Sequence, residues 1–181
     1  MATPSHALFF AVKPDAAAVK QLLALGQRLR AHHGLKGRLF EAGRLHVTLH
    51  FFGRFGVLDQ SFIDRLCRAA DEVHGKPFTL RFDHVGSFGR ASNAPLVMQT
   101  HDDVAGIKAL HERLALALSS QGLGASLGHR FEPHVTLMYD DRSLPVHEVD
   151  PIEWTVNAFE LVHSETGQGH RVLRRWLLRA P

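Results

Sequence analysis

The sequence contains the tetrapeptide His-Val-Thr-Leu twice, first at His46–Leu49 and again at His134–Leu137. By composition, a second identical copy arises by chance in about one such chain in a hundred, so the repeat indicates a duplicated unit. The β-branched and apolar residues around both copies favour strands. The fold must therefore hold two similar strands that lie far apart in the sequence.

A strand places successive side chains on opposite faces of its sheet. Around the first copy, this alternation predicts one apolar face and one polar face, made of Leu45, Val47, Leu49 and Phe51 against His46, Thr48 and His50. In the second copy, His134 and Thr136 lie opposite Val135 and Leu137. Two such strands, side by side or related by an approximate twofold axis, bring two imidazoles and two hydroxyls into one cleft above an apolar floor.

The rest of the chain alternates strand-like and helix-like segments in an order that roughly repeats between its halves. The predicted strands are Leu8–Val12, Leu45–Phe52, Phe78–Phe82, Leu96–Thr100, Val135–Tyr139, Trp154–Val162 and Val172–Leu178, with Gly86–Pro95 as a loop. The predicted helices run from Asp15 to Gly34, over Asp59–His74, and from a cap at Asp102 or Asp103 through Leu118. We predict one α+β domain, residues 1–181, with two similar lobes.

Composition is that of one globular domain: 181 residues, 45% hydrophobic and 22% charged. No apolar run is long enough for a membrane span, and Met1–Pro14 lacks the pattern of a secretory signal, so we expect a cytoplasmic protein. The single cysteine, Cys67, excludes an internal disulfide and a cysteine-based zinc site. A formal charge of +3 suits an anionic ligand without specifying one.

Two imidazoles in one cleft can perform phosphoryl transfer. Breaking a phosphodiester in line requires a base at the entering oxygen and an acid at the leaving oxygen, and two histidines can supply both. A threonine hydroxyl on the same strand face can donate a hydrogen bond to a non-bridging phosphate oxygen. His46, His134, Thr48 and Thr136 are therefore the candidate catalytic residues, with the acid and base roles left open by symmetry.

Metal binding is the competing interpretation, because His46 and His50 have the four-residue spacing of paired ligands on a helix. The surrounding residues favour a strand, in which positions four apart are roughly 13 Å from each other. No glutamate follows His46, so the metalloprotease motif is absent. We therefore expect no metal ion and no other cofactor in the reaction.

The segments Arg44–Gly53 and Phe131–Leu137 resemble the two signature segments of the two-histidine phosphoesterase superfamily. Within it, the chain is most similar to the LigT-like RNA 2′,3′-cyclic phosphodiesterases, also described as 2′-5′ RNA ligases. Leu8–Val12 and Leu173–Leu177 resemble the opening and closing strands of that family. The resemblance implies a bilobal α+β fold in which two antiparallel sheets line a central cleft and helices pack outside.

The resemblance also implies the reaction, which is metal-independent hydrolysis of a terminal 2′,3′-cyclic phosphate to a 2′-phosphate. His46 takes the position of the proton donor to the leaving 3′ oxygen, and His134 that of the proton acceptor from water. Thr48 and Thr136 take the positions that hold phosphate oxygens. The implied partners are RNA ends or small cyclic-phosphate nucleotides, with no membrane and no obligate protein partner, and we expect a monomer.

Two positions depart from the family pattern. Tyr139 stands where many members carry an arginine, and either His170 or Arg171 stands where the closing strand often begins with a tyrosine. Tyr139 is a candidate for stacking on a base, although strand alternation places it on the packed face of Val135 and Leu137. Arg130, just before the second motif, is a candidate phosphate contact.

Two alternatives to hydrolysis remain open. The first is the reverse reaction, which joins RNA ends through a 2′-5′ linkage and uses the same groups. The second is a non-catalytic module that binds a nucleotide or RNA on the same scaffold.

Overall fold

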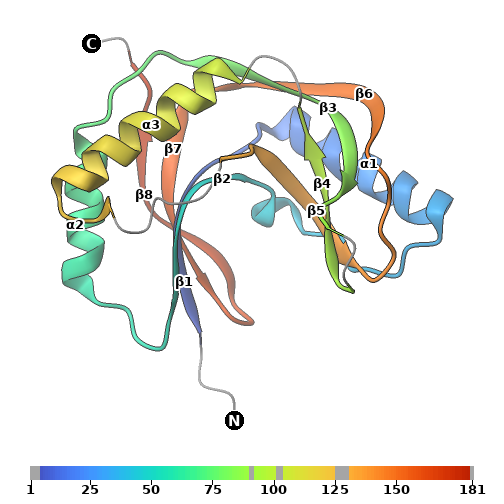
Figure 1. Ribbon diagram of the computed structural model, residues 1–181, viewed down its shortest axis with the longest axis horizontal. Coiled ribbons are helices and arrows are strands. Elements are labelled where there is room, and N and C mark those ends of the chain that lie inside the picture. The colour runs from blue at the N-terminus through green and yellow to red at the C-terminus, as the bar shows by residue number, and fades with distance from the viewer. Residues whose placement is uncertain (1–4, 90–91, 101–103, 125–130, 180–181) are drawn as a thin grey trace.

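The structure is a computed structural model that describes residues 5–89, 92–100, 104–124 and 131–179. Within these residues the strands form two four-stranded antiparallel sheets, with strand orders β2-β1-β7-β8 and β5-β4-β3-β6 (Figure 1). The chain is therefore an α+β fold built from two sheets of equal size, which confirms the predicted fold class.

The first sheet is built from the two ends of the chain and the first motif. Its strands are β1 (His6–Val12), β2 (Val47–Phe55), β7 (Ala158–Glu165) and β8 (Gly169–Leu177). Helix α2 (Gln60–Asp71) contacts β8. On β1, Leu8, Phe10 and Val12 are fully buried in the main core, whereas Phe9 and Ala11 form a separate small cluster with Val162 on the other face.

The second sheet holds the second motif. Its strands are β3 (Phe78–Ser87), β4 (Ala94–Gln99), β5 (His134–Asp140) and β6 (His147–Val156). Helix α1 (Ala16–His33) packs against β5 and β6, and α3 (Ala105–Ser120) packs against α2 and β3. Figure 1 shows α2 and α3 beside the first sheet and α1 beside the second. None of the helices in the described residues is long and apolar enough to cross a membrane.

Helix α1 begins and ends where its sequence signals predict. The carboxylate of Asp15 accepts a hydrogen bond from the backbone N–H of Ala18 at 2.8 Å, which caps the first turn. Gly34 ends the helix with a φ of 62°, a left-handed conformation that glycine adopts without steric cost. The cap of α3 is Val104, and the predicted caps Asp102 and Asp103 lie outside the described residues.

The predicted single strand over Trp154–Val162 is wrong. The chain leaves the second sheet at the end of β6 and enters the first sheet at the start of β7, with Asn157 between them. The carbonyl oxygen of Asn157 accepts a hydrogen bond from the backbone N–H of Leu178 at 2.8 Å. Apolar residues on both sides of Asn157 are buried, so the sequence pattern does not mark the crossing from one sheet to the other.

The two motif strands are edge strands of different sheets, and they contact each other. The segment before β2 also contacts β5: the backbone N–H of Phe40 donates to the carbonyl oxygen of Leu137 at 2.8 Å, and Leu39 forms an isolated bridge with Met138. The short helix η1 (Ala42–Arg44) then leads into β2. This arrangement brings the two copies of the motif together at the junction of the sheets.

Candidate active site

Each motif strand carries an irregularity directly after its threonine. In β2, Thr48 pairs with Ala11 and His50 with Phe10, so Leu49 is an extra residue. In β5, Thr136 pairs with Val97 and Met138 with Leu96, so Leu137 is extra in the same way. The duplication therefore extends to a β-bulge at the equivalent position, and a bulge reverses the alternation of the side chains that follow it.

The bulge in β2 contradicts the predicted polar face of His46, Thr48 and His50. His50 is buried, at 5% exposure, and Phe51 is half exposed. The ring of His50 stacks on His111 of α3 at 4.1 Å, and its Nε2–H donates to the carbonyl oxygen of His111 at 2.9 Å. His46 and His50 therefore do not face the same side, which removes the geometry for a metal ion shared between them.

The bulge in β5 likewise contradicts the predicted packing of Tyr139 on the face of Val135 and Leu137. Met138 is fully buried, whereas Tyr139 is 43% exposed, with its ring 5.9 Å from that of Phe40. Tyr139 and Phe51 thus occupy equivalent positions in the two lobes. Tyr139 is five positions after His134 along the strand, about 16 Å, so it lies away from that histidine.

His46 is held by bonds at both ring nitrogens. Its Nδ1 lies 2.6 Å from the carbonyl oxygen of Arg44, which can only accept, so Nδ1 carries the hydrogen. In the neutral ring, Nε2 then accepts a hydrogen bond from the hydroxyl of Thr48 at 3.1 Å. The ring also stacks on Phe9 of β1, with centroids 4.8 Å apart.

His134 is oriented in the same way as His46. Its Nδ1–H donates to the carbonyl oxygen of Glu132 at 2.8 Å, again two residues upstream. The rings of Phe88 and His134 meet edge to face, with their centroids 4.8 Å apart. Both motif histidines therefore turn Nε2 away from the backbone bond, which leaves that atom for chemistry.

The electrostatic environment of His46 includes His134. Burial lowers the pKa of the His46 imidazole to about 4, the bond to Arg44 opposes this shift, and the positive charges of Lys13, His134 and Arg44 add to it. The effect of His134 on His46 places the two rings within electrostatic range of each other. The contact between β2 and β5 brings the two motifs to one junction, and the convergence of the two imidazoles on one ligand stays a prediction.

His170 of β8 is a third histidine at this site. Its ring meets the ring of His46 edge to face at 5.2 Å, and that of Phe9 at 5.3 Å. Burial lowers its pKa to about 4, with further lowering by His46, Arg44 and Lys13. Its buried Nδ1 has no hydrogen-bond partner among the described residues. In the sequence, His170 is marked only as one of two residues that stand where the closing strand of the family often begins with a tyrosine. That signal does not indicate where its ring lies.

Two cationic side chains accompany the histidines. Lys13 follows β1, and its Nζ pairs with the carboxylate of Glu160 at 3.4 Å. Arg44 lies directly before the first motif, with its guanidinium carbon 4.4 Å from the centre of the Phe40 ring. Both charges act on His46 and His170, so they also favour an anion at this position. Arg130, the predicted phosphate contact, lies outside the described residues.

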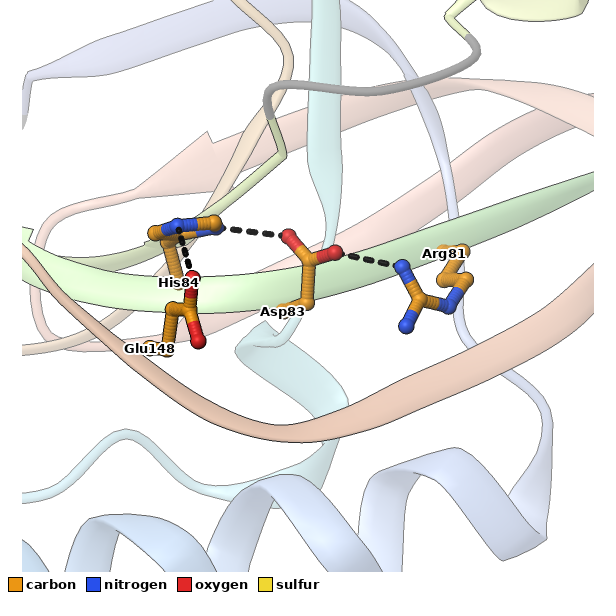
Figure 2. A network of polar contacts seen from close by, with 4 residues as sticks. All are labelled: Arg81, Asp83, His84 and Glu148. Carbon is orange, nitrogen blue, oxygen red and sulfur yellow. Dashed lines mark hydrogen bonds and ion pairs between the residues drawn. The ribbon is translucent and has the colours of Figure 1, made fainter.

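A polar row crosses the second sheet from the second motif. His134 pairs with Gln99, Gln99 with His84, and His84 with Glu148, so all four share one face. Figure 2 shows Asp83 between Arg81 and His84. The Asp83 carboxylate accepts from His84 Nδ1 at 2.7 Å and pairs with Arg81, while Glu148 lies 4.0 Å from His84 Nε2. Burial favours a higher pKa of the Asp83 carboxyl, but the hydrogen bond from His84 and the charge of Arg81 outweigh it and lower that pKa.

This fold, with one His-x-Thr motif on the edge strand of each sheet, defines a class of protein. Residues 10–168 match the model of the 2′-5′ RNA ligase superfamily, and the chain belongs to that superfamily. It is similar to E. coli LigT in its apo form, with 26% identity, a TM-score of 0.75, and coverage of 97% of this chain and 99% of that chain.

Other solved structures agree with this assignment. E. coli LigT complexed with 3′-AMP has 27% identity and a TM-score of 0.75, with coverage of 97% of this chain and 99% of that chain. The protein TT0787 of Thermus thermophilus shares the fold at 22% identity, with a TM-score of 0.76 and coverage of 96% of this chain and 98% of that chain. No curated protein sequence matches the chain. The chain is thus a LigT-like two-histidine phosphoesterase by family and fold.

Proposed function

We propose that this protein hydrolyses 2′,3′-cyclic phosphates of RNA ends or small nucleotides to 2′-phosphates, without a metal ion in the reaction. The observation that carries the proposal is the matched state of His46 and His134. Each ring donates Nδ1–H to a carbonyl oxygen two residues upstream, and each presents Nε2. Two close, equivalently oriented imidazoles are what an in-line displacement at one phosphorus requires.

In the proposed reaction, a water oxygen attacks phosphorus and gives its proton to Nε2 of His134. The bond from phosphorus to the 3′ oxygen breaks, and Nε2–H of protonated His46 supplies the proton to that oxygen. The products are a 2′-phosphate, a free 3′ hydroxyl, neutral His46 and protonated His134. Exchange of protons with solvent restores the starting state, so no other reactant is needed.

The proton-donor role requires His46 to be protonated, whereas its pKa in the unoccupied site is about 4. The cyclic phosphate carries a negative charge, and an anion close to an imidazole raises its pKa. Bound substrate therefore favours the protonated form of His46, which is the proton donor. Protonation also turns Nε2 from an acceptor into a donor, which frees the hydroxyl hydrogen of Thr48 for a phosphate oxygen.

The remaining groups bind the anion in this proposal. Thr48 and Thr136 donate to the non-bridging oxygens, on which negative charge accumulates in the transition state. Lys13 and Arg44 attract the phosphate, and Arg130 is a further candidate contact. Tyr139 is too distant for the scissile phosphate and, as an exposed ring, contacts RNA farther along the strand.

The structural relatives support a nucleotide as the ligand. E. coli LigT, at 27% identity, has been solved in complex with 3′-AMP and in complex with NADP+. Both ligands combine a base, a ribose and a phosphate. A ribonucleotide with a cyclic terminal phosphate has the same parts, and it gives the paired histidines a phosphorus atom to act on.

The test is turnover of adenosine 2′,3′-cyclic phosphate, with the position of the product phosphate read by phosphorus NMR. The wild type is expected to give only the 2′-phosphate, and EDTA is expected to leave the rate unchanged. His46→Ala and His134→Ala are expected to slow turnover by about 10²-fold or more with an unchanged circular dichroism spectrum, whereas His32→Ala, an exposed control, retains the wild-type rate. Turnover within about tenfold of the wild-type rate in either motif variant contradicts the proposal.

The two alternatives give different products. Incubation with RNA halves that end in a cyclic phosphate and a 5′ hydroxyl yields a 2′-5′ junction if joining dominates. Tight binding of the nucleotide without any product indicates a binding module. Hydrolysis without joined product is the expected result, because water at about 55 M outcompetes a dilute RNA hydroxyl.

A further inference from the structure

A second cluster of chemically capable side chains lies away from the motif histidines. His6 at the start of β1 pairs across the strands with Glu165 at the end of β7, and Leu8 pairs with His163. Directly paired residues share a face, so His6, His163 and Glu165 all lie on the face of the main core. Phe9 and Val162 lie on the opposite face, which is the side that meets His46.

The three side chains aim their ligating atoms at one another. Nδ1 of His6 lies 3.0 Å from Nε2 of His163, and one ring nitrogen of each histidine and a carboxylate oxygen of Glu165 lie within 4.8 Å of one another. Two nitrogens bound to one tetrahedral zinc ion, each about 2.1 Å from it, are about 3.4 Å apart. The two nitrogens therefore need to separate by a few tenths of an ångström, and the carboxylate oxygen to approach them by up to about 1.4 Å, for the three groups to hold one ion.

We propose that His6, His163 and Glu165 form a zinc site that joins the first strand of the chain to β7. Neutral imidazoles and a carboxylate are ligands that zinc accepts, and three protein ligands leave one position for water. The ion replaces the hydrogen bond between the two imidazoles. Its place is the end of the first sheet at which β1 begins and β7 ends (Figure 1).

The surroundings of the cluster set the strength of binding. Glu165 is the acidic side chain that acts electrostatically on His163, while His6 and Arg171 act with the opposite sign. Arg171 pairs directly with His163 across β7 and β8, so its exposed guanidinium opposes a bound cation. Removal of this charge is therefore expected to tighten zinc binding, and removal of a ligand is expected to weaken it.

The site is separate from the proposed reaction. No motif histidine or threonine is a ligand, and the body of the first sheet lies between the cluster and His46. A metal that binds the folded chain and not the unfolded chain raises stability according to its concentration. The expected consequence of zinc is therefore a higher unfolding temperature, with turnover unchanged.

Titration calorimetry with zinc chloride on the chelator-treated, desalted chain tests the site. The wild type is expected to bind one zinc ion tightly. His6→Ala and Glu165→Gln are each expected to weaken that event at least tenfold, and Arg171→Gln to strengthen it. His32→Ala and His147→Ala remove histidines of another surface group and serve as controls, with binding unchanged.

Two further readouts keep the test decisive. Cobalt is expected to give the visible absorption of a tetrahedral site in the wild type and to lose it in Glu165→Gln, whose partly exposed position at the strand end tolerates the change. Zinc is expected to raise the unfolding temperature of the wild type, of Arg171→Gln and of the two control variants, and to raise that of His6→Ala and Glu165→Gln much less. Absence of binding at 100 μM zinc, or binding unaffected by both ligand variants, overturns the proposal.

Discussion

His46 and His134 share one hydrogen-bonding state: each imidazole donates Nδ1–H to a backbone carbonyl oxygen two residues before it, at 2.6 and 2.8 Å respectively. The backbone of each motif thus fixes the tautomer of its own histidine. The hydrogen lies on Nδ1 in both rings, so Nε2 is the atom that exchanges protons with a ligand. The same local sequence therefore produces two equivalent proton-transfer groups, one on each sheet.

The effect of removing each motif histidine is expected to depend on the leaving group of the substrate. Nitrophenolate departs without protonation, whereas a ribose oxygen needs an acid. On a nucleoside p-nitrophenyl phosphodiester, His46→Ala is expected to stay within about tenfold of the wild type, while on the cyclic phosphate it loses about 10²–10⁴-fold. His134→Ala loses activity on both. Steady-state rates on the two substrates measure this, and the reverse pattern would exchange the two roles.

Loss of either motif hydroxyl is expected to slow the reaction. Thr48→Val and Thr136→Val keep the shape of the side chain and remove a donor to the phosphate, so kcat is expected to fall about 10²-fold. Thr48→Ser and Thr136→Ser retain the hydroxyl and are expected to stay near the wild-type rate. Unchanged rates in both valine variants would show that the hydroxyls do not contact the phosphate in the transition state.

Acid is expected to destabilise the protein through its buried histidines. Burial lowers the pKa of His50 to about 4, against about 6.5 in the unfolded chain. The unfolded state binds more protons between these values, so stability is present above pH 6.5 and is lost as pH falls toward 4. The His50→Gln substitution keeps a hydrogen-bond donor, the side-chain amide, and removes the group that binds a proton in acid.

The free energy of unfolding, measured by urea titration at several pH values, checks this expectation. His50→Gln is expected to reduce the pH slope by up to about 1.4 kcal/mol per pH unit in that window. His32→Gln, in an exposed position on α1, is the control and keeps the wild-type slope. Equal slopes in all three proteins would contradict a neutral, buried His50.

Asp140 is expected to stabilise the second motif strand. Its carboxylate accepts from the backbone N–H groups of Arg142, Lys36 and Gly37 at 2.8, 2.6 and 2.5 Å, which ties the segment after α1 to the end of β5. These bonds, the one from Arg142 first, hold the pKa of the Asp140 carboxyl below its usual range. Asp140→Ala leaves three backbone donors unpaired and is expected to cost about 1–3 kcal/mol.

Denaturant unfolding of this variant gives the measurement. Asp140→Asn retains one acceptor oxygen and is expected to lie between the wild type and Asp140→Ala. Asp150→Ala, an exposed substitution on β6, serves as the control and leaves stability unchanged. A denaturation midpoint of Asp140→Ala equal to that of the wild type would show that water replaces the carboxylate without loss of stability.

The elements with strong local signals could be predicted from the sequence. Asp15 and Gly34 set the ends of α1, and the repeated tetrapeptide identified both motif strands and the pair of histidines. These features depend on residues close together in the chain. The predicted strands Phe78–Phe82 and Leu96–Thr100 lie in β3 and β4, and both strands extend into the predicted loop. A hairpin between these two predicted segments was wrong in its register, because β3 pairs with β4 through His84–Ser87, whereas Phe78–Phe82 pairs with β6.

Features that depend on pairing between strands could not be predicted. Simple alternation through His50 and Tyr139 was wrong because each strand has one extra residue after its threonine, and a bulge depends on the partner strand. The crossing at Asn157 was hidden because both sheets bury the residues around it. His170 meets His46 only through the sheet order, which joins the closing strand to the first motif through β7 and β1.

The most direct measurement is an NMR titration that follows the imidazole nitrogen signals of His46 and His134 while adenosine 2′-monophosphate is added. One phosphate between the two rings is expected to shift both sets of signals along one saturation curve, with a single dissociation constant and one ligand per chain. His84, on the same sheet face but two strands from His134, provides an internal reference. Separate binding curves for His46 and His134, or a response from only one of them, would contradict their convergence on one phosphorus atom.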